Sequence, residues 1–238
     1  MKRILFLLAL LFVAANVISA QAQSIEHTEA LGEFTAVSLS GNINVELIAA
    51  DENSIEVHLH DSDAQRFRWH IASDGTLSVA LRPTVGRSVH ADVRIYYRAP
   101  LREIRVNGAR LTAEQSRLAQ LFSLTLRGGA NAIIDMNADD IELSVTGNSA
   151  LVASGETKYL TLRATERSRV DSRRLTARAV EAEAATGAEV YLHASERLVV
   201  NARNTSTIYY AGRPSILKDR RSRARIGLGL YEIGVTEN

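Results

Sequence analysis

Two histidines that lie two residues apart, His58 and His60, could support metal chemistry together with Asp61 and Asp63. Alternate side chains of a β-strand share one face, and imidazole and carboxylate groups are common ligands of zinc. No third histidine lies near them in the sequence, and the others are scattered singly. We therefore interpret the pair as part of a solvated strand face and predict no metal site.

Two pairs of carboxylates could serve glycoside chemistry, which needs two acids roughly 5 to 10 Å apart. Asp139 and Asp140 are adjacent, and Glu181 and Glu183 share one face of an expected strand. No Asp, Arg and Lys residues gather with either pair over successive repeats of the chain. We predict no catalytic residues, and a polysaccharide-active enzyme stays the alternative.

The motifs of nucleophilic and nucleotide chemistry are missing from the sequence. It has no Cys and no Gly-x-Ser-x-Gly, and Gly227-x-Gly229 neither follows a strand nor opens a helix. We therefore expect no cofactor and no enzymatic activity.

Two groups of residues could instead bind a partner. The first is a basic cluster, which could attract lipopolysaccharide, an acidic glycan or a membrane surface, although we favour a solvated segment that keeps strand edges apart. It consists of Lys218, Arg220, Arg221, Arg223 and Arg225. The second is an aromatic strip that could stack on sugar rings or equally pack internally. It consists of Tyr191, Tyr209 and Tyr210.

A repeat of about nineteen residues positions these groups. A small residue, a variable residue and an aliphatic or Ala recur six times, and periods near twenty indicate stacked coils. The repeats are Ala109-Arg110-Leu111, Ala130-Asn131-Ala132, Ser149-Ala150-Leu151, Ser168-Arg169-Val170, Ala188-Glu189-Val190 and Ser206-Thr207-Ile208. We predict a parallel β-solenoid, right-handed and β-helix-like, of about six coils, in which the small and aliphatic columns face inward and the middle residue faces solvent.

Residues 34–97 alternate apolar and polar side chains with a period of two, which predicts strands. Asp74-Gly75 is a hairpin-type turn, and the short connections favour antiparallel pairing in this region. The fold class is thus all-β, with an antiparallel N-terminal region before the solenoid.

The N-terminal residues predict export. Lys2 and Arg3 precede an apolar run, and Ala20-Gln21-Ala22 resembles a cleavage site, so residues 1–22 are expected to form a signal peptide. No later stretch is long and apolar enough to span a membrane. We expect a protein of the periplasm, the outer cell surface or the medium, with no transmembrane segment in the mature chain.

The mature chain divides into three expected parts. Residues 23–100 cap one end of the solenoid, residues 101–212 form its coils, and residues 213–238 fold over the last coil, with the basic cluster on a solvated loop. Basic and acidic residues number 28 and 27, whereas a nucleic-acid binder would be strongly basic. We therefore expect no nucleic-acid partner.

Three motifs occur in a characteristic order over roughly residues 34–212. They are Phe34-x-x-Val37-x-Leu39-x-Gly41-x-Ile43-x-Val45-x-Leu47, Asp74-Gly75-Thr76-Leu77-x-Val79 and Tyr97-x-x-Pro100-Leu101-x-x-Ile104-x-Val106-x-Gly108-Ala109. In this order the chain resembles the head GIN domain family, exported auto-transporter adhesins of Bacteroidetes-type bacteria. The resemblance implies a β-solenoid and a cell-envelope setting, but no activity and no catalytic residues.

Together these observations predict a non-enzymatic envelope protein that acts as an adhesin-like or structural interaction module. Its expected partners are a glycan or another envelope or surface protein. A carbohydrate-binding or polysaccharide-active protein is the alternative, and the sequence leaves the oligomeric state open.

Overall fold

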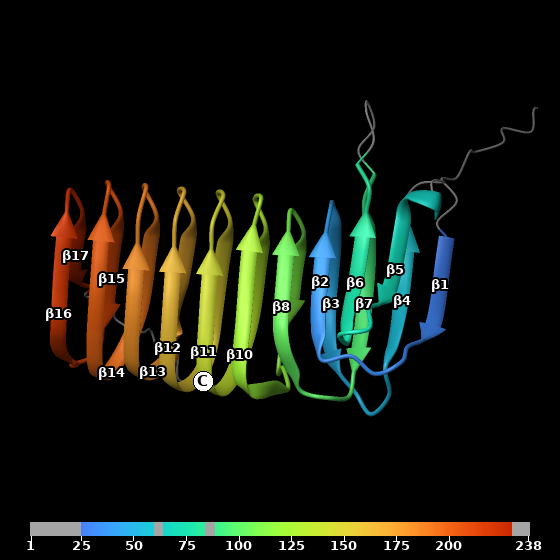
Figure 1. Cartoon of the computed structure of the whole chain (residues 1–238), viewed down its shortest axis with the longest axis horizontal. Coiled ribbons are helices and arrows are strands. Elements are labelled where there is room, and N and C mark those ends of the chain that lie inside the picture. The colour runs from blue at the N-terminus through green and yellow to red at the C-terminus, as the bar shows by residue number, and fades with distance from the viewer. Residues whose placement is uncertain (1–24, 60–63, 84–88, 230–238) are drawn as a thin grey trace, which may run out of the picture.

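The computed structural model describes residues 25–59, 64–83 and 89–229. Its strands form one continuous sheet that winds into a parallel β-solenoid of about seven turns, with antiparallel pairs at the N-terminal end (Figure 1). This confirms the predicted fold class. The expected signal peptide lies outside the described residues.

The described residues contain seventeen strands, one 3-10 helix and no α-helix. The strands before the regular coils are β1 (Ile25–Ala30), β2 (Ala36–Ser40), β3 (Ile43–Ala49), β4 (Ser54–Leu59), β5 (Phe67–Ile71), β6 (Thr76–Leu81), β7 (Ala91–Tyr97), β8 (Leu101–Asn107) and β9 (Arg110–Ala113). The later strands are β10 (Leu118–Arg127), β11 (Asn131–Val145), β12 (Ala150–Ala164), β13 (Arg169–Ala184), β14 (Glu189–Arg203), β15 (Thr207–Ala211), β16 (Ser215–Ser222) and β17 (Arg225–Leu228). The 3-10 helix η1 spans Ala64–Arg66.

The repeat that the sequence reveals is the coil of the solenoid, and its predicted columns are confirmed. Leu151 of β12 pairs with Ala132 of β11 and Val170 of β13, and all three side chains are buried. The variable residue between the small and the aliphatic position faces outward, as at Arg169. Parallel stacking therefore places each type of side chain over its own kind along the axis, which buries a continuous apolar core.

Residues with positive φ form the turn before each small residue. Gly128 and Gly129 occupy one of these corners, whereas Glu166 and Arg167 adopt the same left-handed conformation two coils later. The buried Ser149 hydroxyl holds such a corner in place, because it accepts a hydrogen bond from the Ala130 amide (3.1 Å) and donates to the Thr146 carbonyl (2.6 Å). A small hydroxyl thus adds hydrogen bonds to backbone groups of two successive corners.

The N-terminal region combines both kinds of pairing. The antiparallel pairing expected there is confirmed for β5 with β6, which Asp74-Gly75 connects, and for β4 with β1 and β7. β2 and β3, however, pair in parallel with β8 and β9, so the stack of coils begins before residue 100. The Gly41-Asn42 corner between β2 and β3 explains this, because it bends the chain from one face to the other instead of forming a hairpin.

The C-terminal segment forms a further coil and does not fold back over the solenoid as we expected. β16 continues the sheet in parallel beyond β14, and β17 does the same beyond β15. Ala224-Arg225-Ile226 is a seventh copy of the repeat, and Ile226 extends the buried aliphatic column beyond Ile208. Residues 230–238 of the expected segment lie outside the described residues.

Candidate binding face

One broad face of the solenoid presents outward side chains in regular rows. Strands β9, β11, β12, β13, β14, β15 and β17 lie side by side there. One row of outward residues, which we call the central row, runs along the solenoid axis. It consists of Thr112, Ile133, Val152, Asp171, Tyr191, Tyr209 and Gly227.

The second and third residues of the central row are apolar. Ile133 and Val152 are neighbours in register, and 55% and 46% of their surfaces are exposed. Covering these two neighbouring side chains with an apolar group of a partner would be favourable.

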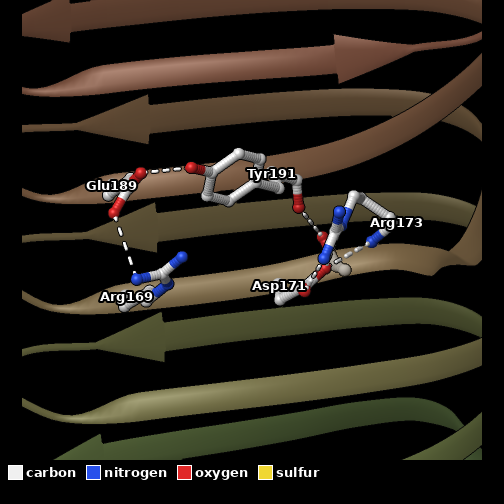
Figure 2. A network of polar contacts seen from close by, with 6 residues as sticks. Arg169, Asp171, Arg173, Glu189 and Tyr191 are labelled. Carbon is white, nitrogen blue, oxygen red and sulfur yellow. Dashed lines mark hydrogen bonds and ion pairs between the residues drawn. The ribbon is translucent and has the colours of Figure 1, made fainter. Parts of the chain in front are cut away.

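The second half of the central row contains a polar network around Tyr191 (Figure 2). The Arg173 Nε donates to Asp171 at 2.8 Å, and the Arg169 guanidinium lies 3.7 Å from the Glu189 carboxylate. The Tyr191 hydroxyl donates to Glu189, and the Ser172 hydroxyl donates to the Tyr191 carbonyl at 2.9 Å. The contacts join neighbouring coils and fix the direction of the tyrosine ring.

Tyr191 and Tyr209 form an aromatic stack on this face. Their ring centroids are 5.3 Å apart and their planes differ by 25°, a separation typical of offset stacking. The guanidinium carbons of Arg169 and Arg173 lie 5.7 and 5.3 Å from the Tyr191 centroid, within the range of cation–π attraction. Tyr191 is thus held by two cations from one neighbouring coil and one ring from the other.

The prediction of an aromatic strip is wrong for Tyr210. Tyr210 pairs with the buried Leu192 and packs against the core, whereas Tyr209 pairs with Tyr191. Adjacent residues of a strand point to opposite sides of the sheet, so Tyr209 and Tyr210 cannot share one face.

The Asp171 carboxylate of the polar network has a lowered pKa. Hydrogen bonds from the Arg173 side chain lower its pKa below the ordinary 3.8, with a further contribution from the Arg173 amide. The carboxylate therefore stays ionised in moderate acid, and its charge offsets that of Arg173 beside the tyrosine ring.

The predicted basic cluster does not lie on a single loop. Most of its residues belong to β16 and β17, where successive side chains point to opposite sides of the sheet. Lys218 and Arg220 pair with the outward positions Val199 and Asn201 of the opposite face. Arg221 pairs instead with the buried Ala202 and binds Asp219, with Nε 2.8 Å from Oδ1. Arg223 lies in the following turn, and Arg225 lies on β17 beside the central row. The five cations therefore do not form a single patch.

Two of the four candidate catalytic carboxylates, Asp139 and Glu183, are engaged in ion pairs. Lys158 Nζ lies 2.9 Å from Asp139 and Gln120 donates to the same carboxylate at 3.1 Å, and these hydrogen bonds lower the Asp139 pKa below 3.8. Glu183 pairs with Arg163 at 3.3 Å and with Arg203 at 2.7 Å. A carboxylate with a lowered pKa, such as Asp139, is poorly suited to act as a general acid.

A shallow depression of about 710 Å³ lies farther along the same broad face, between β3, β4, β7 and β9. His58 and Arg110 help to line it, and Asn44 donates to Asp92 there at 2.7 Å. His60, Asp61 and Asp63 lie outside the described residues, and the parts of the chain that are described contain no metal-binding group of three or more His, Cys, Asp or Glu residues.

Arg169, Asp171, Arg173 and Glu189 are site residues that the sequence analysis missed. The sequence places Arg169 and Glu189 at the variable positions of two successive repeats. Their ion pair could not be predicted, because only the register of β13 and β14 shows that these two residues are neighbours.

Comparison with known proteins identifies the class to which this solenoid belongs. The family described as "Putative auto-transporter adhesin, head GIN domain" matches residues 33–214, most of the chain. The chain therefore belongs to that family, as its motifs predict. No curated protein matches it.

Solved structures share the fold at low sequence identity. A "putative adhesin" of Bacteroides fragilis is 16% identical, with 88% of this chain and 98% of that chain covered and a TM-score of 0.78. A "putative lipid binding protein" of Parabacteroides distasonis is 14% identical, with 87% and 96% covered and a TM-score of 0.68. A "putative adhesin" of Parabacteroides merdae is 15% identical, with the same coverage and a TM-score of 0.67. Among the described residues, none of the helical segments has the length and apolar character needed to cross a bilayer.

Proposed function

We propose that this protein is exported to the cell envelope and works there as a non-enzymatic, adhesin-like interaction module. The observation that carries the proposal is the broad face with its central row, where exposed aliphatic side chains and a fixed tyrosine stack stand on a rigid sheet. Side chains held by a regular scaffold lose little entropy on binding, which favours recognition. The family's description as adhesins is consistent with this role.

The polysaccharide-active alternative has weaker support. Polysaccharide hydrolysis by two carboxylates needs one of them protonated as an acid. Asp139 has a lowered pKa and a lysine partner, so it is a poor donor of that proton. We therefore expect binding without turnover.

Binding and turnover can be measured on the same material. The mature protein, labelled with a fluorophore, would be applied to immobilised bacterial envelopes and to an array of neutral and acidic glycans, and the bound polysaccharides would then be tested for cleavage. We expect retention without cleavage. A lack of binding to both surfaces would overturn the interaction role, and a cleavage rate that disappears in Asp139→Asn would establish the enzyme instead.

A further inference from the structure

The aromatic stack of the central row ends at a glycine. Tyr209 stacks on Tyr191 on one side, and on its other side the register pairs it with Gly227 of β17. A Cβ at Gly227 would lie 3.9 Å from Cδ1 and 4.0 Å from Cε1 of the Tyr209 ring. The chain therefore leaves open the place where a third ring would continue the stack.

Polar groups surround this open place. Arg225 and Thr207 are neighbours in register, and Arg225 lies two residues before Gly227 on the same strand, so both share its face. Among the described residues, the Arg225 guanidinium, the Thr207 hydroxyl and the Tyr209 hydroxyl have no side-chain partner. Each is therefore available to a ligand.

The surroundings of Gly227 carry a positive charge from Arg225. Glu189, the nearest acid in the row of Arg225, is engaged by Arg169 and by the Tyr191 hydroxyl. Arg225 is exposed and has no carboxylate beside it among the described residues. An exposed guanidinium suits a carboxylate, which it can bind through two parallel hydrogen bonds.

From this geometry we propose that Tyr209, Gly227 and Arg225 form a binding site for an acidic sugar unit of a glycan. The pyranose ring takes the place of the missing third ring and lies against Tyr209, with Gly227 providing the room. The sugar carboxylate binds Arg225, and the Tyr209 and Thr207 hydroxyls bind ring hydroxyls. The proposal rests on the interaction role proposed above and names its ligand class.

Tyr191 has a supporting part in this site. Arg169 and Arg173 of one neighbouring coil and Glu189 of its own strand hold it in place, so that the Tyr209 ring rests on a fixed surface. A platform that is ordered before binding loses less conformational entropy when the sugar arrives. Tyr191 is therefore a positioning residue of the site.

The site can be tested by filling the open place. In Gly227→Tyr the new ring would extend the stack at ordinary contact distance, so the fold should be preserved while the sugar is excluded. Tyr209→Ala removes the platform, and Arg225→Gln removes the charge. Tyr159→Ala, which removes an exposed tyrosine from the opposite face of the solenoid, is the matched control.

Binding of each variant would be measured by titration with a uronic-acid oligosaccharide and its neutral counterpart, beside thermal denaturation. We expect Gly227→Tyr and Tyr209→Ala to lose affinity about tenfold or more, the scale of one aromatic contact. Arg225→Gln should bind the acidic and neutral sugars alike, and Tyr159→Ala should bind like the unchanged protein.

The outcomes separate this site from the broader role. Unchanged affinity in Gly227→Tyr and Tyr209→Ala, with glycan binding present, would overturn the site while the interaction role stands. Binding to envelopes with none to either sugar would also overturn the site. A lack of binding to envelopes and glycans alike would overturn both.

Discussion

At the scale of single residues, this fold depends on backbone conformations and hydrogen bonds that only certain side chains permit. Gly155 adopts a φ of 114°, and Ser149 bonds two backbone groups at a corner. On the broad face, Asp171 holds Arg173 beside the ring of Tyr191. These contacts join one coil to the next, so a change at one residue affects two coils.

Gly155 should not tolerate a side chain. An Ala Cβ at this position would lie 2.0 Å from the carbonyl oxygen of Met136, which is backbone and cannot rotate away. We expect Gly155→Ala to lower the free energy of unfolding by about 2–4 kcal/mol, measured by urea denaturation. In Gly32→Ala, the control, the nearest atom is Ile71 Cδ1 at 3.6 Å, and the change should be small. Equal losses in the two variants would contradict the close approach of β12 to β11.

Stability should depend on Asp171 in acid. Because the Asp171 pKa is lowered in the folded state, its ionised form stabilises the fold fully above the unfolded value of 3.8. That stabilisation is lost as the pH falls below 3.8 through the folded pKa. Asp171→Asn should therefore lower the melting temperature at pH 7 and flatten its decline between about pH 5 and pH 2.5. Arg173→Gln should flatten the same part of the curve. Parallel curves for the variants and the unchanged protein would exclude this linkage.

At the scale of elements, the solenoid is built from strands whose inner and outer sides are fixed by register. Leu151 lies inside between Ala132 and Val170, and its neighbour Ala150 faces out between Asn131 and Arg169. A shift by one residue would exchange the two sides, which the apolar column opposes.

A carboxylate should distinguish these two sides. Leu151→Asp places an unpaired charge at a position with 1% exposure, and we expect a loss of several kcal/mol in unfolding free energy. Ala150→Asp places the same charge in solvent beside Arg169, where it should cost little. Thermal denaturation of both variants measures the difference, and equal shifts would show that the register is wrong.

The same elements show how far the sequence could predict the structure. The repeat was visible because a parallel stack requires like side chains in each column, as at Leu151 and Val170. The parallel pairing of β2 was missed, since a two-residue alternation looks the same in parallel and antiparallel sheets. The seventh repeat at Ala224 was also missed, although it has the same pattern of a small, a variable and an aliphatic residue. The site was predicted only in part. Tyr191 and Tyr209 were named, but their stacking and the contacts of Tyr191 with Arg169 and Arg173 depend on neighbours about twenty residues apart in the chain.

At the scale of the whole molecule, the two ends of a solenoid raise the same difficulty, because a strand at an end presents unpaired backbone groups. At the N-terminal end the stack continues into antiparallel strands, with β1 beside β4 (Figure 1). At the C-terminal end, β16 carries charges in the columns that are apolar in every coil before it. Asp219 follows Val200, and Arg221 follows Ala202. Charged residues at inward positions of an edge strand discourage another chain from pairing with it.

The Asp219–Arg221 pair should therefore limit association end to end. In the double variant Asp219→Val/Arg221→Val, the last coil would present an apolar surface that resembles the interior of the solenoid, and a second molecule could stack on it. We expect a concentration-dependent increase in mass relative to the unchanged protein, measured by sedimentation equilibrium between micromolar and millimolar concentrations. Lys218→Ser/Arg220→Ser, which removes two charges from the outward side of the same strand, should leave the mass unchanged because these side chains do not lie over the core. If both double variants associate equally, net charge rather than the inward ion pair keeps the molecules apart. If neither associates, the end of the solenoid is protected by something other than this pair.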